Sequence, residues 1–327
     1  MSPSLWDRCL MLFRRGRRGA ALAALTAMLA LLGGWAAARG GSDAIVEATA
    51  FSVDSTFGFE SAEETASCPG NRRALGGGVV QSGFPEGAVA SSGPLDGSGR
   101  PARTHDGDKA KQWFTSMTNF SSGEMDFKVF AICSADSSAR LETEVFRTES
   151  NEVGHAVATC PAGKRALGGG VISPHSQSPD DSAVVASGPF DASGGFTALG
   201  DGDKARQWYG AAFINNSGAV HTKFRVFVIC AADSNATVQR TQFNVGSPGT
   251  DYDWADCPGA RRAVGGGVLP ASGPVRRFYV RASGPLGSTS EVENLEDGDE
   301  ATQWYAAIFN SSGGQTRSFS VFAICES

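Results

Sequence analysis

Three copies of the triplet Asp-Gly-Asp carry the most regular acidic groups in the sequence. Two carboxylates on one tight turn offer the hard oxygen ligands that Ca²⁺ binds. The same residues also build turns, because Asp accepts hydrogen bonds from nearby backbone and Gly adopts left-handed conformations. Calcium takes roughly six to eight oxygens, yet extra acids flank only the third copy, at Glu296 and Glu300. The pattern favours a turn, with calcium as the alternative. The six candidate ligands are Asp106, Asp108, Asp201, Asp203, Asp297 and Asp299.

A Gln-Trp pair follows each triplet at constant spacing. An indole ring could stack on the apolar face of a sugar, which would give the protein a lectin-like function. Alternatively, the ring lies in the core over the bare backbone of a Gly-Gly-Gly run that precedes it in every copy. That second interpretation is favoured, because it explains why three glycines persist in a strand that they otherwise weaken. The stacking candidates are Trp113, Trp208 and Trp304.

Cysteines are equally regular, with two in each copy and a seventh, Cys9, near the N-terminus. No Cys-x-x-Cys pair occurs and no cysteine has a histidine at ligand spacing, so disulfides are expected rather than a zinc site. Two symmetric pairings fit the repetition. One joins consecutive copies and leaves the first cysteine to meet the last; the other closes each copy on itself and is favoured, because self-contained modules duplicate with their crosslinks. The favoured scheme pairs Cys68 with Cys133, Cys160 with Cys230, and Cys257 with Cys325.

Catalytic signatures are nearly missing from the sequence. It contains no Gly-x-Ser-x-Gly elbow, no phosphate-binding loop ending in Gly-Lys-Ser or Gly-Lys-Thr, and no His-Glu-x-x-His. The four histidines occupy non-equivalent places in the repetition, and only His105 stands beside an aspartate. We therefore assign no catalytic residue and no cofactor, and we expect the protein not to be an enzyme.

The N-terminus carries an export signal. Four arginines between positions 14 and 18 precede an apolar run from Ala20 to Leu32, and Ala36 and Ala38 supply a small-residue cleavage site. This pattern predicts a signal peptide over residues 1–38. The alternative is an uncleaved membrane anchor, because the uncharged stretch reaches about the 20 residues that span a bilayer. Either way, the remainder is expected outside the cell, as a secreted or an anchored protein.

The net charge of the chain limits the classes of partner that it can bind. Removing residues 1–38 takes away five arginines and one aspartate, so the net charge of −6 becomes −10. Such a domain repels phosphate backbones, and no basic stripe alternates with aromatic residues. Nucleic-acid binding is therefore not expected, and a membrane contact is expected only if the N-terminal segment stays uncleaved.

The landmarks recur in one order that defines three repeats. Each copy reads Cys-Pro, Gly-Gly-Gly-Val, Ser-Gly-Pro, Asp-Gly-Asp, Gln-Trp and Ile-Cys. Length varies between Gly-Gly-Gly and Ser-Gly-Pro and again beside an Asn-, Ser- and Gly-rich stretch before the closing Cys, which indicates surface loops. The predicted repeats span 43–136, 137–233 and 234–327.

Period-two alternation predicts strands throughout the repeats. In the closing segment, Phe127 and Val129 share one face while Phe130 and Ile132 share the other, so a central strand covered on both sides is expected. The Trp strand is predicted as its hairpin partner, with small residues that leave room for the bulky ones. Each repeat thus holds five or six strands. We predict an all-β fold of three homologous modules, favouring tandem small β-sandwiches over a pseudo-threefold β-prism.

The repeated string from Cys-Pro to Val-Phe-Ala-Ile-Cys is similar to a repeat of secreted actinobacterial proteins, which is often found in tandem and is mostly of unassigned function. This resemblance covers nearly the whole chain after the leader and implies no active residues. In arrangement, three disulfide-bearing β units also resemble vitelline membrane outer layer protein I, a three-sheet β-prism, although its repeats are much shorter.

These observations together predict an exported, non-enzymatic extracellular structural or binding protein. Its repeated loops would face a matrix, a cell wall or a glycan partner. The alternative is a lectin-like carbohydrate-binding protein that uses the three Trp strands, with calcium at the Asp-Gly-Asp triplets.

Overall fold

A computed structural model shows the fold of the chain after the predicted leader. The segment 1–38, predicted as a signal peptide or anchor, lies outside the described residues. Within the described part, no helix has the length and apolar character needed to cross a bilayer. The described residues are 43–54, 60–135, 137–173, 182–215, 221–274, 276–289 and 294–327.

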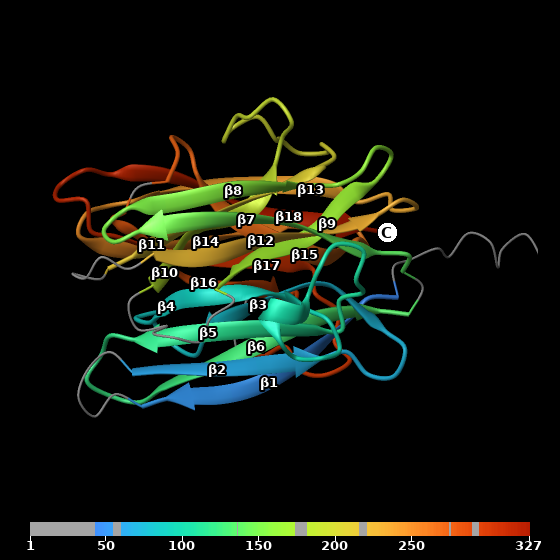
Figure 1. Ribbon diagram of the computed structural model, residues 1–327, viewed down its shortest axis with the longest axis horizontal. Helices are drawn as coiled ribbons and strands as arrows, with labels where there is room; N and C mark the ends of the chain where they lie inside the picture. The colour runs from blue at the N-terminus through green and yellow to red at the C-terminus, as the bar shows by residue number, and fades with distance from the viewer. Residues whose placement is uncertain are drawn as a thin grey trace, which may run out of the picture. The chain divides into compact units, whose positions relative to one another are not determined.

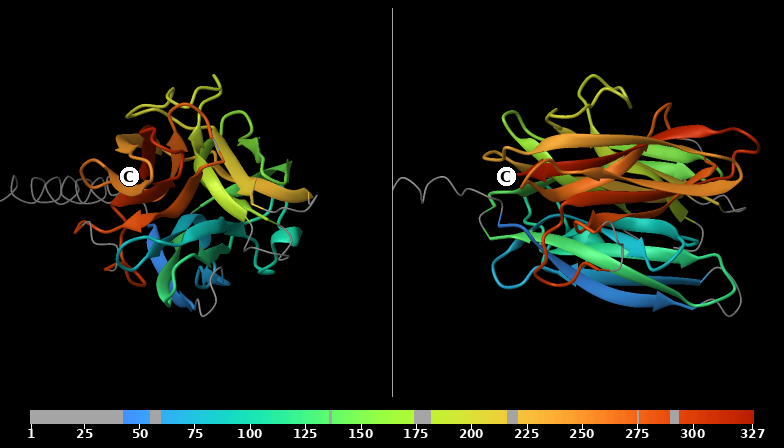
Figure 2. Two further views of the ribbon diagram at one scale, coloured as in Figure 1. Left: turned by 90° about the vertical axis from the view of Figure 1, so that its left-hand side faces the viewer. Right: turned by 180° about the vertical axis from the view of Figure 1, so that it is seen from behind.

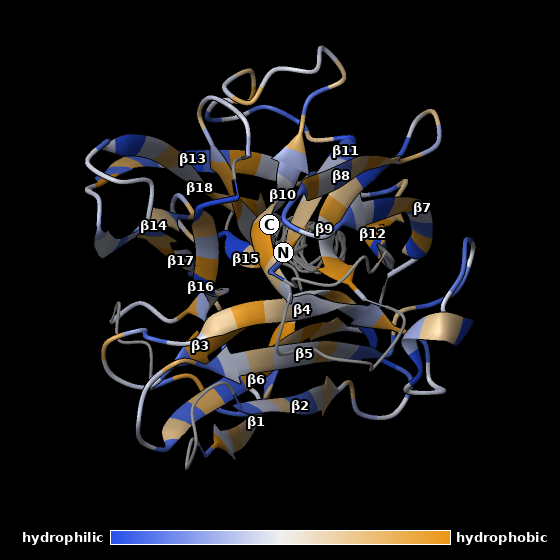
Figure 3. Ribbon diagram, turned by 60° about the vertical axis from the view of Figure 1, so that its left-hand side comes forward, coloured by the Kyte–Doolittle hydropathy of each residue, from blue (hydrophilic) through white to orange (hydrophobic). Residues whose placement is uncertain are grey.

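Each repeat contributes six strands, which confirms the all-β prediction (Figure 1). The opening, Gly-Gly-Gly, Ser-Gly-Pro, Trp and closing segments all form strands, and a further strand ends just before each first cysteine. One short 3₁₀ turn, Pro101–Arg103, is the only helical element among the described residues. Polar and apolar residues alternate along outer strands such as β13, Thr237–Val245, and β7, Arg140–Glu149 (Figure 3).

The eighteen strands form three six-stranded antiparallel sheets, and each sheet is shared between two repeats. We name them sheets A, B and C. Sheet A takes three strands from the first repeat and three from the third. Its order is β1 (Ile45–Val53), β6 (Met125–Ser134), β3 (Arg73–Gln81), β16 (Phe278–Leu286), β17 (Gln303–Asn310) and β14 (Gly249–Asp256).

Sheets B and C follow the same plan with the other two pairs of repeats. Sheet B, from the first and second repeats, runs β2 (Glu60–Ser67), β5 (Gln112–Asn119), β4 (Ala88–Leu95), β9 (Arg165–Ile172), β12 (His221–Ala231) and β7. Sheet C, from the third and second repeats, runs β13, β18 (Arg317–Glu326), β15 (Arg262–Pro270), β10 (Ser182–Phe190), β11 (Gln207–Ile214) and β8 (Val153–Thr159).

Pairing between repeats is cyclic. At the centre of each sheet, the Ser-Gly-Pro strand of one repeat pairs with the Gly-Gly-Gly strand of another: Ser92 with Val171, Ser187 with Val268, and Ser283 with Val79. The first repeat is thus joined to the second, the second to the third, and the third back to the first. Figure 2, left, shows the strands grouped around a common centre. Of the two predicted arrangements, the prism matches this strand order, because no sheet is built from one repeat alone.

The Gly-Gly-Gly runs are needed where these strands meet. A Cβ on Gly76 would lie under 3.0 Å from the backbone of Gly265, and Gly168 approaches the first repeat closely in the same way. Gly265, in the third repeat, approaches the second repeat closely, because a Cβ there would collide with the carbonyl oxygen of Leu167. Three strands from three repeats therefore approach one another at a distance that only glycine permits.

The predicted hairpin between the Trp strand and the closing strand is wrong. β5 belongs to sheet B, whereas β6 belongs to sheet A and pairs with β1 and β3. The small residues after Trp do make room for bulky neighbours, but they do so across the core: a Cβ on Gly210 would touch the side chains of Val171 and Val226. The closing strand is central and covered on both faces, as predicted.

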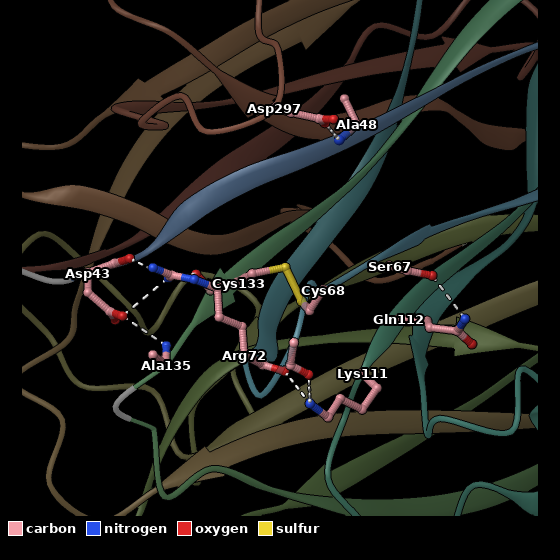
Figure 4. The surroundings of a disulfide bond; sticks show 11 residues. Asp43, Ala48, Ser67, Cys68, Arg72, Lys111, Gln112, Cys133, Ala135 and Asp297 are labelled. Carbon is pink, nitrogen blue, oxygen red and sulfur yellow. Dashed lines mark hydrogen bonds and ion pairs between the residues drawn. A yellow bond between two sulfur atoms is a disulfide. The ribbon is translucent and has the colours of Figure 1, made fainter.

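Three disulfides follow the within-repeat scheme, pairing Cys68 with Cys133, Cys160 with Cys230, and Cys257 with Cys325. In each, the first cysteine follows the end of a strand of one sheet and the second lies in a strand of another, so the bond ties two sheets together. Near the first disulfide, Arg72 pairs with Asp43 at 3.2 Å and donates to the Cys133 carbonyl (Figure 4). Three disulfides in one domain indicate an oxidising compartment.

Candidate functional site

The three Trp side chains belong to the core. Trp113, Trp208 and Trp304 are 2%, 0% and 1% exposed, so no ring face is open to a sugar. Each Nε1–H donates to the Ser hydroxyl of its own Ser-Gly-Pro strand at 2.9 to 3.0 Å. Each ring also lies over the middle glycine of its own Gly-Gly-Gly run, where a Cβ would come within 2.3 to 2.6 Å of indole carbon atoms. The core interpretation is therefore the one that the structure shows.

The Asp-Gly-Asp triplets join neighbouring repeats. The Oδ1 atom of Asp106 accepts from the backbone N–H of Thr143 at 2.7 Å, at the opening strand of the second repeat. Asp201 accepts from the N–H of Arg240 in the third repeat, and Asp297 accepts from the N–H of Ala48 in the first, each at 2.8 Å. The first Asp of each triplet thus binds the opening strand of the next repeat in the cycle, and the Asp297 contact is visible in Figure 4.

The other two triplet residues shape the turn that makes this contact possible. The second Asp accepts a backbone N–H three residues before it, at 2.8 to 2.9 Å; these residues are Asp108, Asp203 and Asp299. The central glycines adopt φ values of +81° to +88°, which L-residues rarely adopt. Among the described residues, no group of three or more His, Cys, Asp or Glu side chains gathers as a metal site would require. The triplets fit the turn interpretation.

Removing one of these inter-repeat contacts should cost measurable stability. We expect Asp201→Ala to lower the free energy of unfolding by about 1 kcal/mol, because the Arg240 N–H loses its carboxylate acceptor. Chemical denaturation of the purified protein measures this change. The matched control is Asp233→Ala, which removes an exposed aspartate between β12 and β13 and should change stability by less than about 0.5 kcal/mol. Equal effects for both variants would contradict the joining role.

The described residues enclose a small cavity at the centre of the fold. A cavity of about 20 Å³ lies where equivalent residues of all three repeats converge, among them Gly77, Gly169 and Gly266. This volume suits about one water molecule. A larger molecule does not fit in this cavity.

A surface cleft of about 390 Å³ opens between the first and third repeats. Loops of the first repeat supply Phe84 and Phe120, which are 58% and 41% exposed, while Pro248 comes from the turn between β13 and β14 of the third repeat. Exposed apolar surface gathered at one place is typical of ligand-binding and interaction sites. We call this site the aromatic cleft. Its full lining is Phe84, Glu86, Phe120, Ser121, Pro248, Gly249, Thr250, Arg281 and Phe309.

Arg281 gives the aromatic cleft a fixed polar group. Its guanidinium lies 4.5 Å from the centre of the Phe309 ring and donates to the Pro85 carbonyl at 2.6 Å. Burial lowers the pKa of Arg281, while the nearby charge of Glu86 raises it. The guanidinium remains charged because its ordinary pKa lies far above neutrality. An apolar surface beside a held charge is the usual composition of a small-molecule site.

The loop beside Phe120 is held in place by its asparagine. Asn119 Nδ2 donates to the carbonyls of Val53 and Gly123 at 2.9 and 2.6 Å, and its Oδ1 accepts from the Ser121 N–H. Asn310 repeats this arrangement in the third repeat, with Val245 and Gln315 as acceptors. In the first and third repeats, the Asn-, Ser- and Gly-rich stretches are therefore surface loops, as predicted, and their own side chains hold them in place. Residues 216–220 of the corresponding stretch in the second repeat lie outside the described residues.

Sequence reasoning missed the aromatic cleft. The residues that suggest chemistry in the sequence recur in all three repeats, whereas Phe84 and Phe120 do not recur. The available signal was an aromatic residue inside a loop of variable length, beside Gly and Ser. Comparison of the chain with protein-family models and with curated proteins finds no match.

Proposed function

We propose that this protein is an exported, non-enzymatic extracellular binding or structural protein that meets its partner through clefts between neighbouring repeats. The observation that carries the proposal is the aromatic cleft, where two exposed Phe side chains stand on ordered loops at the junction of the first and third repeats. A disulfide-tied prism supports such a role, because it provides a rigid base for loops outside the cell.

A carbohydrate is the ligand class we propose for this cleft, which keeps the lectin-like function but moves its site. Exposed aromatic rings offer stacking surface to the apolar face of a sugar. Glu86 and Arg281 line the same cleft and offer an acceptor and donors to hydroxyl groups. Its volume lies within the range of roughly 300 to 1,000 Å³ that is typical of ligand sites.

A glycan array followed by calorimetry tests this function. We expect the secreted protein to bind a subset of glycans, and the variant Phe84→Ala with Phe120→Ala to bind them at least about tenfold more weakly, a change of about 1.4 kcal/mol. Repeating the titration with and without Ca²⁺ shows whether the metal contributes.

The control is Tyr252→Ala, which removes an aromatic residue that is 46% exposed and does not line the cleft. It should leave glycan affinity unchanged. If the folded wild-type protein binds no glycan on the array or in solution, the carbohydrate function is removed and a structural role remains. Equal loss in the control and in the cleft variant would remove the cleft as the site.

A further inference from the structure

A second cleft, of about 590 Å³, lies between the second and third repeats at the position equivalent to the aromatic cleft. Both clefts are built from two loops of one repeat and the turn between the first two strands of another. In this one, the loops after β15 and after β17 belong to the third repeat, and the turn between β7 and β8 belongs to the second. The third equivalent position falls on residues outside the described part of the chain. The pseudo-threefold relation thus places two comparable sites on one domain.

The residues in the second cleft are chemically different from those in the first. Where the aromatic cleft carries exposed Phe side chains, this one is lined by Arg276, Arg277 and Arg317. We name it the arginine cleft. Glu152 is the one carboxylate in its lining among the described residues, so the three guanidinium groups outweigh it. Three arginines around one cleft stand out in a domain whose net charge after residue 38 is −10.

Few interactions within the described part of the protein involve these three guanidinium groups. The ion pairs found among the described residues involve Arg72, Lys128 and Arg262, and none involves the arginines of the cleft. Arg317 donates to the Gln315 side chain at 2.5 Å, whereas the side chains of Arg276 and Arg277 are exposed. Exposed guanidinium groups beside a cleft can donate to an incoming acceptor.

We propose that the arginine cleft binds a compact oxyanion group, such as phosphate, sulfate or a polycarboxylate. Guanidinium groups are planar forks that match oxyanion geometry with paired hydrogen bonds. The Ser312 and Gln315 side chains in the same lining add neutral polar groups. This site is separate from the aromatic cleft, so it does not depend on carbohydrate binding there.

Calorimetry and thermal unfolding of the secreted protein test the proposal, using inorganic phosphate, sulfate and citrate at low ionic strength. A specifically bound anion stabilises the folded state according to its concentration relative to its Kd. We expect saturable binding by the wild type. The variant Arg276→Gln, Arg277→Gln, Arg317→Gln should bind at least about tenfold more weakly, because charge-assisted hydrogen bonds are lost. The anion that binds most tightly identifies the charge and shape that the cleft prefers.

The matched control carries Arg100→Gln, Arg103→Gln and Arg147→Gln, which remove the same charge from exposed positions outside the cleft. This control distinguishes specific anion binding in the cleft from general salt effects, because phosphate and sulfate also stabilise proteins by exclusion from their surfaces. The double variant Arg276→Gln, Arg277→Gln changes only exposed side chains and serves if the triple variant does not fold. Retained binding in the cleft variants, or no saturable binding by the wild type, would overturn the proposal.

Discussion

Gly266→Ala is expected to lower the free energy of unfolding by about 3 kcal/mol, at the upper end of what overpacking a core costs. The added Cβ would lie well under 3.0 Å from both the Phe322 carbonyl oxygen and the Trp304 ring. Neither neighbour can move freely. The carbonyl belongs to the adjacent strand β18, and the indole is anchored through Nε1 to Ser283.

Guanidinium chloride unfolding of wild type and variant measures this change. Gly246→Ala in the same repeat is the matched control, because a Cβ there meets nothing within 4 Å and its φ lies outside the left-handed region. That control should raise the free energy of unfolding by less than about 1 kcal/mol, because alanine reduces the conformational entropy of the unfolded chain. If Gly266→Ala is as stable as Gly246→Ala, the close contact between glycine and Trp is not a determinant of the fold.

Replacing Cys160 and Cys230 together by alanine should lower the free energy of unfolding by about 4 kcal/mol. The chain-entropy model gives this value for the 70 residues that separate the two cysteines. The bond also joins the end of β8 in sheet C to β12 in sheet B, so its loss releases two sheets from each other. We expect a lower midpoint of chemical denaturation than in the wild type.

The corresponding double variants in the other repeats provide the comparison. Cys68 with Cys133 and Cys257 with Cys325 are separated by 65 and 68 residues, so their removal should cost almost the same amount. Peptide mapping without reductant confirms that the two remaining bonds keep their partners. A loss below about 1 kcal/mol in all three variants would mean that the prism holds without its crosslinks.

The sequence predicted the strands well because each one carries a local pattern. Alternation around Phe127 and Val129 predicts the closing strand, and the Gly-Gly-Gly run favours a buried Trp from the sequence alone. These inferences needed only residues close in the chain or at repeated offsets. The turn at each Asp-Gly-Asp was equally local, because Asp108 closes it on its own backbone.

Pairing between strands was harder to predict for a physical reason specific to repeats. Three nearly identical motifs present the same edges, so β3 could pair with its own β4 or with β16 of another repeat at equal local cost. The choice is made by the close approach of all three glycine strands at the centre, which no single repeat displays. The contact of Asp297 with Ala48 was hidden for the same reason, since it joins the last repeat to the first.

Both clefts escaped prediction because they lie where the repeats differ. Phe84 and Arg276 occupy corresponding loops, after β3 and after β15, yet share no chemistry. A search for recurring residues discards such positions, although a repeated scaffold can vary its loops without disturbing its core. The shared residues explain the fold, and the loop residues that differ supply the proposed ligand chemistry.

Cyclic pairing also fixes how many repeats this architecture accepts. In an open tandem array, a unit can be gained or lost at either end with little effect on the rest. Here each repeat completes half of two sheets, so deleting one leaves the inner edges of β3- and β4-type strands without partners, and a fourth copy would have none to pair with. Three repeats are therefore the number that closes the cycle of shared sheets. A single repeat produced alone would find its missing half-sheets only in two further copies of itself, which makes a symmetric trimer the form in which it could fold.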